Sequence, residues 1–210
     1  MIRRLLEPIF EPLFHDCSFG FRPGRSCHQA IERVLSFHRE GDRVTLDADI
    51  AGFFDNIPHK LIVDAVHAEV ADGNILNLVE KFLAAGVMEN GVFKPTTIGT
   101  PQGGVISPLL ANIVLNQLDW RLEQAGYRFV RYADDFVIVC KDRVQAEAAL
   151  KLVDEIMTDL GLSLSPEKTK IASYGKGYEF MGFTLSSKSR TMRPKSLEKF
   201  KTKIREITRR

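Results

Sequence analysis

Apolar and polar residues alternate without a break over 44–50, VTLDADI. This alternation predicts a strand with one apolar face and one face that carries two carboxylates, the second of them Asp49. A second run, RYADDFVIVC over 131–140, is rich in Val, Ile, Phe and Tyr and is also typical of strand. The adjacent carboxylates of Asp134 and Asp135 interrupt this run and predict a tight hairpin turn there.

Apolar spacings of three and four residues elsewhere predict helices, several of them with capping signals. Ser26 and Gln29 form a capping box, and Asp142 and Gln145 repeat the pattern. The predicted helices are the end of one over 1–14, one after Ser26, 60–70, 75–85, 108–125 capped by Ser107, one after Asp142, and a basic helix over 195–210. Residues 178–185 are predicted to form one further strand.

The order strand, helices, hairpin, helix, strand predicts an α+β fold with a ferredoxin-like split βαβ core and helices on one face. That topology places the strand ending at Asp49 beside the hairpin. An Asp pair at a hairpin tip is unfavourable unless a cation lies between the charges. A solvated turn explains 132–135 alone equally well, and the second carboxylate-bearing strand favours a metal site.

Mg²⁺ prefers carboxylate oxygens and keeps positions open for water and substrate phosphates. Two such ions about 4 Å apart can activate an attacking hydroxyl and stabilise a leaving oxygen. The residues therefore lead to the hypothesis of two-metal phosphoryl or nucleotidyl transfer. Its expected ligands are Asp49, Asp134 and Asp135, with Mn²⁺ as a possible substitute for Mg²⁺.

The 210 residues allow one large or two small domains, and 44% are hydrophobic, as in an ordinary globular chain. We find no apolar run of about 18 residues and no signal peptide, so we expect no membrane span. Cys17, Cys27 and Cys140 form no CxxC, which favours reduced thiols, a cytoplasmic location and no zinc site. The net charge is +2, but 190–210 alone carry nine Lys or Arg against two Glu, which suits a polyanion-binding arm or a solvated helix face.

Two loops are further candidates for ligand contact. The loop over 18–26, SFGFRPGRS, combines aromatic and basic groups, as RNA-binding and single-strand-binding loops do, but it could equally be a packed turn. The loop over 98–108, IGTPQGGVISP, has two glycines that let a backbone approach a ligand closely, although a lone GG is a weak signal. Phe54 could lie under a nucleotide sugar or in the core, and His59 is expected to make local hydrogen bonds. Asn112, Asn116 and Asp119 are expected on the solvent face of the helix over 108–125.

Several blocks together resemble the reverse transcriptase domain of bacterial group II intron-encoded proteins, the intron and retron type. The matching blocks, in the family's order, are SFGFRPGRS at 18–26, DIAGFFDNIPH at 49–59, GTPQGGVISPLL at 99–110, YADD at 132–135, LSPEKTKI at 164–171 and FMGF at 180–183. They span nearly the whole chain, and SFGFRPGRS and YADD favour this lineage over retroviral enzymes.

The resemblance implies a right-hand polymerase whose palm has RRM-like topology. It divides the chain into partial fingers over 1–43, a palm over 44–185 with inserted helices over 60–98, and the start of a thumb over 186–210. It implies these site residues: Asp49, Asp134, Asp135 and the Ile50 carbonyl as metal ligands; Lys168 as an acid near the pyrophosphate; Phe54 as the gate against a ribose 2′-hydroxyl; Gln102, Gly103 and Gly104 at the incoming nucleotide; Met181 and Gly182 in the primer grip; Arg22 and Arg25 at the template.

The implied activity is RNA-directed DNA polymerisation with an RNA template, a DNA primer, dNTPs and Mg²⁺, and intron RNA is an expected partner. The family's basic fingers segment precedes the helix with which this sequence opens. Phosphoryl transfer depends on positive charge around the phosphates, so we expect weak or no polymerisation without that segment, most of the thumb or a complementing chain. The alternative is a non-catalytic intron RNA-binding or maturase remnant. A nucleotide cyclase is chemically possible, but it would leave Phe54 and the loop around Gln102 unexplained.

Overall fold

Four antiparallel strands form the central sheet of the computed structural model, which describes residues 2–85, 87–89, 92–94, 98–101 and 104–208. The strand order is β4-β5-β1-β6. The strands are β1 (Val44–Ala48), β4 (Arg128–Tyr132), β5 (Asp135–Cys140) and β6 (Lys170–Ser173). If these four strands are numbered 1 to 4 along the chain, their order across the sheet is 2-3-1-4. This is the arrangement of a ferredoxin-like split βαβ core. The predicted fold class is confirmed.

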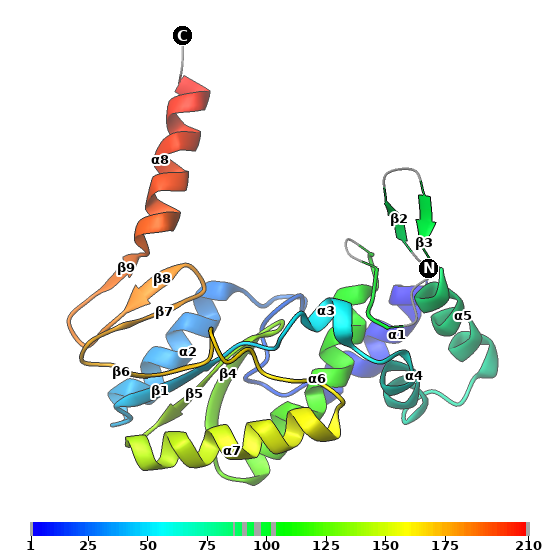
Figure 1. Ribbon diagram of the computed structural model, residues 1–210, viewed down its shortest axis with the longest axis horizontal. Coiled ribbons are helices and arrows are strands. Elements are labelled where there is room, and N and C mark those ends of the chain that lie inside the picture. The colour runs from blue at the N-terminus through cyan, green and yellow to red at the C-terminus, as the bar shows by residue number, and fades with distance from the viewer. Residues whose placement is uncertain (1, 86, 90–91, 95–97, 102–103, 209–210) are drawn as a thin grey trace.

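Long helices join the strands of this core. α6 (Ser107–Gln124) precedes β4, and α7 (Arg143–Asp159) connects β5 to β6 and packs on β1 and β5. α2 (Cys27–Arg39) precedes β1 and packs along β4. In Figure 1, α7 runs below the sheet while the small β7–β9 sheet lies above it.

Helix caps follow the sequence closely, with one exception. Ser26 and Gln29 form the predicted capping box of α2, and the Asp142 carboxylate accepts from Gln145 N–H at the start of α7. Ser107 was predicted to be the N-cap of α6, but it is the first residue of the helix. Its hydroxyl donates to the Pro101 carbonyl at 2.9 Å.

Between β1 and α6 the chain makes a long excursion. It contains α3 (Phe53–Asn56), α4 (His59–His67), α5 (Gly73–Ala84) and a hairpin of β2 (Val87–Glu89) with β3 (Val92–Lys94). The two predicted helices, 60–70 and 75–85, correspond to α4 and α5. The hairpin was not predicted. Ahead of α2 lie α1 (Ile2–Phe10) and the short 3₁₀ helix η1 (Glu11–Leu13), in agreement with the helix end expected over 1–14.

The predicted single strand over 178–185 is instead a hairpin. β7 (Tyr178–Phe180) and β8 (Phe183–Leu185) are joined by Met181 and Gly182, whose φ angles are 48° and 82°. Two successive residues with positive φ reverse the chain, so no continuous strand is possible. β9 (Arg190–Met192) completes this second sheet, and α8 (Pro194–Thr208) follows it.

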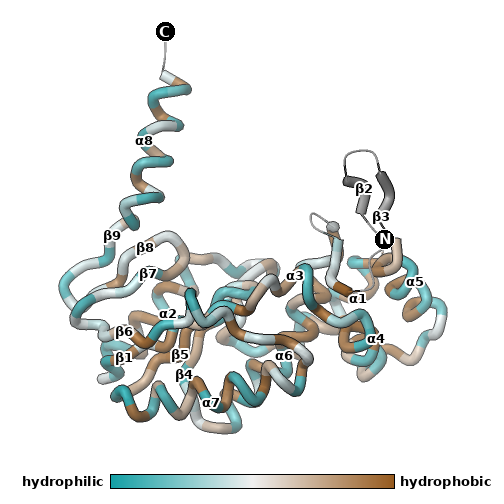
Figure 2. Tube along the Cα trace, viewed as in Figure 1, coloured by the Kyte–Doolittle hydropathy of each residue, from teal (hydrophilic) through white to brown (hydrophobic). Residues whose placement is uncertain are grey.

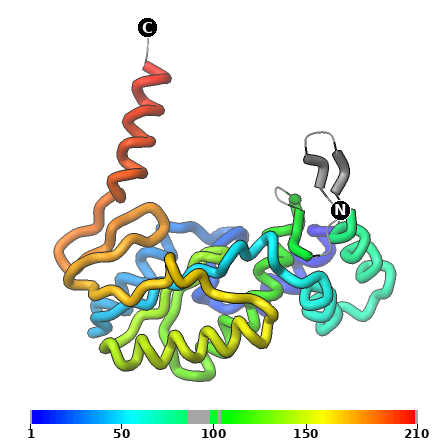
Figure 3. The backbone as a smooth tube through the Cα atoms, viewed as in Figure 1, coloured from blue at the N-terminus to red at the C-terminus, as the bar shows by residue number. Residues whose placement is uncertain are grey.

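The hydrophobic core lies between the central sheet and its helices. α6 is buried on most sides, and Figure 2 shows brown, apolar segments gathered in the sheet and α6 while α8 is largely teal. α8 has no buried residue and leaves the body at the end opposite α4 and α5, as the chain trace in Figure 3 shows. None of the helices in the described part of the chain is both long and apolar enough to cross a membrane.

A buried histidine ties the second sheet to the core. His38, 1% exposed, contacts the Asp42 carbonyl through Nδ1 and the Tyr178 hydroxyl through Nε2, each at 2.9 Å. Its ring stacks on Tyr174 at 3.7 Å between centroids. Burial lowers the pKa of His38 below its ordinary value. The folded chain therefore binds a proton at His38 less readily than the unfolded chain does.

We expect this histidine to make stability fall in mild acid. The unfolded chain protonates His38 near its ordinary pKa, about 6.5, while the folded chain resists protonation, so acid favours unfolding. The contribution is present above that pH and is lost as the pH falls toward the lowered pKa. Urea unfolding at pH 7.5 and 5.5 should show a larger loss for the wild type than for His38→Gln; equal losses would contradict the assignment.

Candidate active site

The two adjacent acidic residues lie at the tip of the β4–β5 hairpin. Tyr132 pairs with Asp135, which leaves Ala133 and Asp134 as a two-residue turn with a φ of 59° at Ala133. Ala48 of β1 pairs with Phe136 of β5, so the next residue, Asp49, emerges beside Asp135. The predicted turn is confirmed, and the antiparallel register brings the three carboxylates to one end of the sheet.

These carboxylates influence one another electrostatically. Partial burial, followed by the neighbouring Asp134 and Asp49 charges, raises the pKa of Asp135 above its ordinary range. Partial burial and the Asp49 charge raise the pKa of Asp134 in the same way. Asp47, two residues before Asp49, has its pKa raised to about 6 by burial and by Asp135. Burial and neighbouring negative charges disfavour the ionised form of these acids. A bound cation would offset that repulsion and stabilise the ionised carboxylates.

Lys168 supplies a positive charge at this site. Its Nζ lies 3.1 and 3.4 Å from the two carboxylate oxygens of Asp49. The segment that carries it is fixed on the end of β1, since Ser165 N–H donates to the Asp49 carbonyl at 2.7 Å and Leu164 bridges to Ile50. Lys168 is thus adjacent to Asp49, and its role as an acid near the pyrophosphate stays a prediction.

The carboxylate oxygens of Asp49, Asp134 and Asp135 are of the kind that hard divalent cations prefer. Their mutual repulsion would be relieved by a cation. Across the described residues, no group of three or more His, Cys, Asp or Glu side chains lies close enough to form a complete ligand set. The roles of Asp49, Asp134, Asp135 and the Ile50 carbonyl as ligands therefore stay predictions.

A groove of about 470 Å³ lies beside two of these acids, and both acidic and basic side chains line it. Asp49, Asp135 and Lys168 line one part of it, and Met181 and Gly182 line another. The β7–β8 turn, where the resemblance places the primer grip, therefore borders the same groove as two of the candidate catalytic acids. A second cavity, of about 540 Å³, shares no lining residue with the first; its lining is Arg3, Phe21, Phe54, Pro101, Gly104, Val105, Ser107 and Pro108.

The second cavity contains the predicted nucleotide-site residues Phe54 and Gly104. The loop before it is fixed on α3, because Thr100 N–H donates to the Phe54 carbonyl at 2.7 Å. His59 Nε2 lies 2.8 Å from the Gly99 carbonyl, in agreement with a local hydrogen-bonding role. Gln102 and Gly103 lie outside the described residues.

Arg22 does not fit its expected place at the template. Its side chain is 4% exposed, and Nη1 donates to the carbonyls of His15 at 2.7 Å and Ser18 at 2.8 Å. An ion pair with Glu11 engages Nε and Nη2. Burial leaves the guanidinium no open face for a phosphate, so Arg22 holds the loop together. Arg25 is partly exposed and pairs with Asp16 at 2.8 Å, and its template contact stays a prediction.

Comparisons with known proteins agree with this geometry. A family model described as "Reverse transcriptase (RNA-dependent DNA polymerase)" matches residues 1–185. The chain belongs to the reverse transcriptase family. Protein YkfC of Escherichia coli is 34% identical over 87% of this chain and 58% of its own length. The group II intron-encoded protein LtrA of Lactococcus lactis is 45% identical over 62% of this chain and 22% of its own length.

Solved structures show the fold of this reverse transcriptase domain in more distant proteins. Telomerase from Candida albicans, solved with a fragment of telomeric RNA, superposes with a TM-score of 0.71 at 13% identity, over 99% of this chain and 42% of that one. Apo telomerase from Candida tropicalis, truncated from its C-terminal domain, gives 0.69 at 14% identity, over 91% of this chain and 44% of that one. At this identity the likeness concerns the fold alone.

Behind the YADD turn of this reverse transcriptase domain lies a buried ion pair. Arg131 and Asp119 are both 0% exposed, and the guanidinium donates to both carboxylate oxygens, at 2.8 and 2.6 Å. Arg131 Nη1 also donates to Asn112 Oδ1 and to the Ala133 carbonyl, each at 2.8 Å. Asn112 and Asp119 are thus inside the protein, and their prediction as solvent-facing residues was wrong. An arginine inside a β-prone run was the signal, since a buried guanidinium requires a partner.

The loop over 17–22 packs against the same turn. Phe19 N–H donates to the Arg131 carbonyl at 2.8 Å, Arg131 N–H donates to the Cys17 carbonyl at 2.9 Å, and Asn112 Nδ2 donates to the Gly20 carbonyl at 2.8 Å. A Cβ at Gly20 would lie 2.2 Å from the Ala133 nitrogen, so only glycine allows this approach. Close packing against the turn therefore explains the glycine at position 20.

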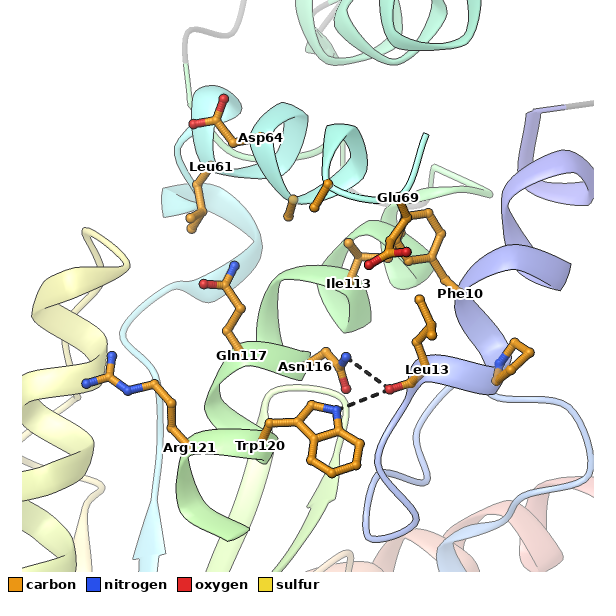
Figure 4. A pocket seen from close by; sticks show the side chains of 13 residues that line it. Phe10, Leu13, Leu61, Asp64, Glu69, Ile113, Asn116, Gln117, Trp120 and Arg121 are labelled. Carbon is orange, nitrogen blue, oxygen red and sulfur yellow. Dashed lines mark hydrogen bonds between the residues drawn. The ribbon is translucent and has the colours of Figure 1, made fainter. Parts of the chain in front are cut away.

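A further cavity has a volume of about 810 Å³. Figure 4 shows it between η1, α4 and α6, where Asn116 Nδ2 and Trp120 Nε1 donate to the Leu13 carbonyl at 3.1 and 3.2 Å. Its lining includes none of the candidate catalytic acids. The metal hypothesis therefore concerns the smaller groove, which Asp49 and Asp135 line.

Gly20→Ala should destabilise the domain, because the new methyl group meets backbone atoms that cannot move aside easily. Overpacking of this kind costs about 1–3 kcal/mol. Gly73→Ala is the matched control, since no heavy atom lies within 4 Å of its added Cβ. Urea unfolding measures both, and equal stabilities would show that the loop moves away from the turn without cost.

Asp119→Ala should cost more, about 3–5 kcal/mol, since it leaves the Arg131 charge buried without its partner. The control is Glu147→Ala, which breaks the exposed 2.8 Å pair with Arg143 on α7 and should cost under about 1 kcal/mol. A loss at Asp119 as small as the control's would mean that water reaches Arg131.

Proposed function

We propose that this chain is the palm region of an RNA-directed DNA polymerase of the group II intron type, which extends a DNA primer on an RNA template. The observation that carries the proposal is the convergence of Asp49, Asp134 and Asp135 at the end of the sheet, beside a groove bordered by the β7–β8 turn. Family membership supports the reaction class, and the carboxylates supply the chemistry that such a reaction needs.

The proposed cofactor is a pair of Mg²⁺ ions, with Mn²⁺ as a substitute. When bound, the ions would activate the primer hydroxyl and stabilise the leaving pyrophosphate. Asp49, Asp134, Asp135 and the Ile50 carbonyl would hold them. In this structure Lys168 is paired with Asp49. If the Asp49 carboxylate held a metal ion instead, the Lys168 ammonium would be free to donate a proton toward the leaving group.

The neighbouring cavities would position the substrates. Phe54, half-buried beside the Gly99–Pro101 loop, would exclude a ribose 2′-hydroxyl by contact. Met181 and Gly182 would support the primer end across the groove from Asp49. We divide the chain accordingly into partial fingers over 1–43, a palm over 44–185 and the start of a thumb over 186–210.

The proposed partners are an RNA template, a DNA primer, dNTPs and an intron RNA. The chain matches 58% of YkfC and 22% of LtrA, so the activity of a longer protein could draw on segments beyond these residues. The three free cysteines support a reducing, cytoplasmic setting.

Primer extension on an RNA template tests the proposal. We expect the full 210-residue chain to add dNTPs weakly in Mg²⁺, and we expect Asp134→Ala to lower the rate at least 100-fold, because one metal carboxylate is lost. Asp154→Ala, an exposed acid on α7, is the control and should leave the rate unchanged. Extension by Asp134→Ala at the wild-type rate would refute the metal assignment.

A second candidate, intron RNA binding without catalysis, is favoured by the exposed basic helix α8, which carries Lys195, Lys199, Lys201, Lys203 and Arg205. Phosphate contacts by such residues give affinity that falls with salt. Salt-dependent RNA binding, with no extension by the wild type and no change of affinity in Asp134→Ala, would favour this candidate over the polymerase.

A further inference from the structure

The helix that carries Phe54 is too short to be stable by itself. α3 has only four residues, Phe53–Asn56, and its N-cap is Gly52, which has a φ of 51° and no side chain to cap it. One helical turn gains too few hydrogen bonds to persist alone in water. In Figure 1, α3 lies between the end of β1 and α4. The position of the Phe54 side chain therefore depends on contacts from outside α3.

Those contacts come from the backbone of residues 98–100. Gly99 N–H donates to the Ile57 carbonyl at 2.7 Å. Thr100 N–H donates to the Phe54 carbonyl, also at 2.7 Å. The fit leaves no space for a side chain, because a Cβ at Gly99 would lie 2.6 Å from a carbonyl oxygen of α3. A displacement of this segment would therefore displace α3 as well.

His59 holds the same segment through its side chain. It is the first residue of α4, and its ring is partly buried. Its Nε2 lies 2.8 Å from the carbonyl oxygen of Gly99, which is a buried residue. A carbonyl oxygen can only accept, so Nε2 carries a proton and donates it to this bond. A buried carbonyl needs a donor, and His59 supplies one.

The chain then continues into the wall of the 540 Å³ cavity. Pro101 and Gly104 line this cavity together with Phe54. The Pro101 carbonyl accepts from Gly104 N–H at 3.0 Å and from the Ser107 hydroxyl at 2.9 Å. Hydrogen bonds thus connect α3 to the segment over 98–101 and connect that segment to the start of α6. Together they set the distance between the Phe54 wall of the cavity and the Gly104 wall.

We propose that His59 is a positioning residue for sugar selection. By holding the Gly99 carbonyl, it keeps Phe54 where the ring excludes a ribose 2′-hydroxyl. This inference rests on the polymerase function proposed above, in which Phe54 is the gate. His59 is absent from the described residues that line the cavity, so it acts through Phe54 and not by contact with the nucleotide.

Single-nucleotide incorporation on a primer–template tests the proposal. The measured quantity is kcat/KM for a dNTP divided by kcat/KM for the matching rNTP, with the full 210-residue chain in Mg²⁺. His59→Leu fills similar space but removes the donor, so we expect the ratio to fall roughly 10-fold, chiefly because kcat/KM for the rNTP rises. His59→Gln keeps an N–H donor and should retain most of the ratio.

A double-mutant cycle with Phe54→Ala asks whether His59 acts through the ring. Phe54→Ala alone should lower the ratio more than His59→Leu does, because the ring itself is removed. In the Phe54→Ala background, His59→Leu should cause no further fall, since residues that act on one feature are not additive. Equal falls with and without the ring would overturn the inference.

Asp142→Ala separates this effect from a general loss of stability. It removes one side-chain bond, 2.9 Å long, at the start of α7, and α7 contributes no residue to the cavity lining. We expect it to lower the Tm about as much as His59→Leu does and to leave the ratio unchanged. A fall of the ratio as large as that of His59→Leu would show that instability alone is responsible.

The outcomes also separate this inference from the polymerase proposal. If the wild type extends the primer and His59→Leu keeps the wild-type ratio, only the role of His59 is overturned. If Phe54→Ala keeps that ratio, the gate and this inference are both overturned, while the assignment of the catalytic carboxylates stands. A wild type that incorporates neither nucleotide overturns the polymerase proposal and this inference together.

Discussion

The buried ion pair of Arg131 and Asp119 is the interaction on which the site depends. Desolvation of two charges is costly, and only good geometry with further hydrogen bonds offsets it. Here the guanidinium makes two contacts with Asp119 and further ones with Asn112 and the Ala133 carbonyl. A hydrophobic pair of the same volume could fill the space, but it could not bind that carbonyl. The ion pair therefore fixes the position of the turn as well as the packing behind it.

The turn requires that support because its front is electrostatically unfavourable. Asp134 and Asp135 lie at the tip with Asp49 beside them, and burial together with mutual repulsion raises the pKa of both turn acids. Ala133 adds a positive φ at the turn. Arg131 opposes these effects from behind, and the charge of Arg131 lowers the pKa of Asp134 against the main trend. The ion pair behind the turn thus holds the turn acids in place, while Lys168 partly offsets the acidic charge in front through Asp49.

The sequence predicted the features that local physics determines. Alternation over 44–50 predicted β1, the caps at Ser26 and Asp142 predicted helix starts, and the acid pair predicted a turn. Each of these features depends on residues only a few positions apart in the sequence. The errors are non-local. Whether Asp119 faces water depends on an arginine twelve residues away, and the burial of Arg22 depends on carbonyls that only the folded loop assembles. Periodicity carries no information about such partners, so the buried polar residues looked like an ordinary solvent face.

The same distinction separates the loop residues whose identity the fold determines from those whose identity it does not. Gly20 is confined by backbone atoms of the turn and Arg22 by the carbonyls around it, so both are set by the fold. Phe21, between them, has a backbone held at positive φ, while its side chain faces solvent and a cavity. Folding alone would favour glycine at its positive φ. The backbone therefore does not account for a large aromatic residue at that position, and its surroundings are the Tyr132 ring and the cavity that it shares with Phe54.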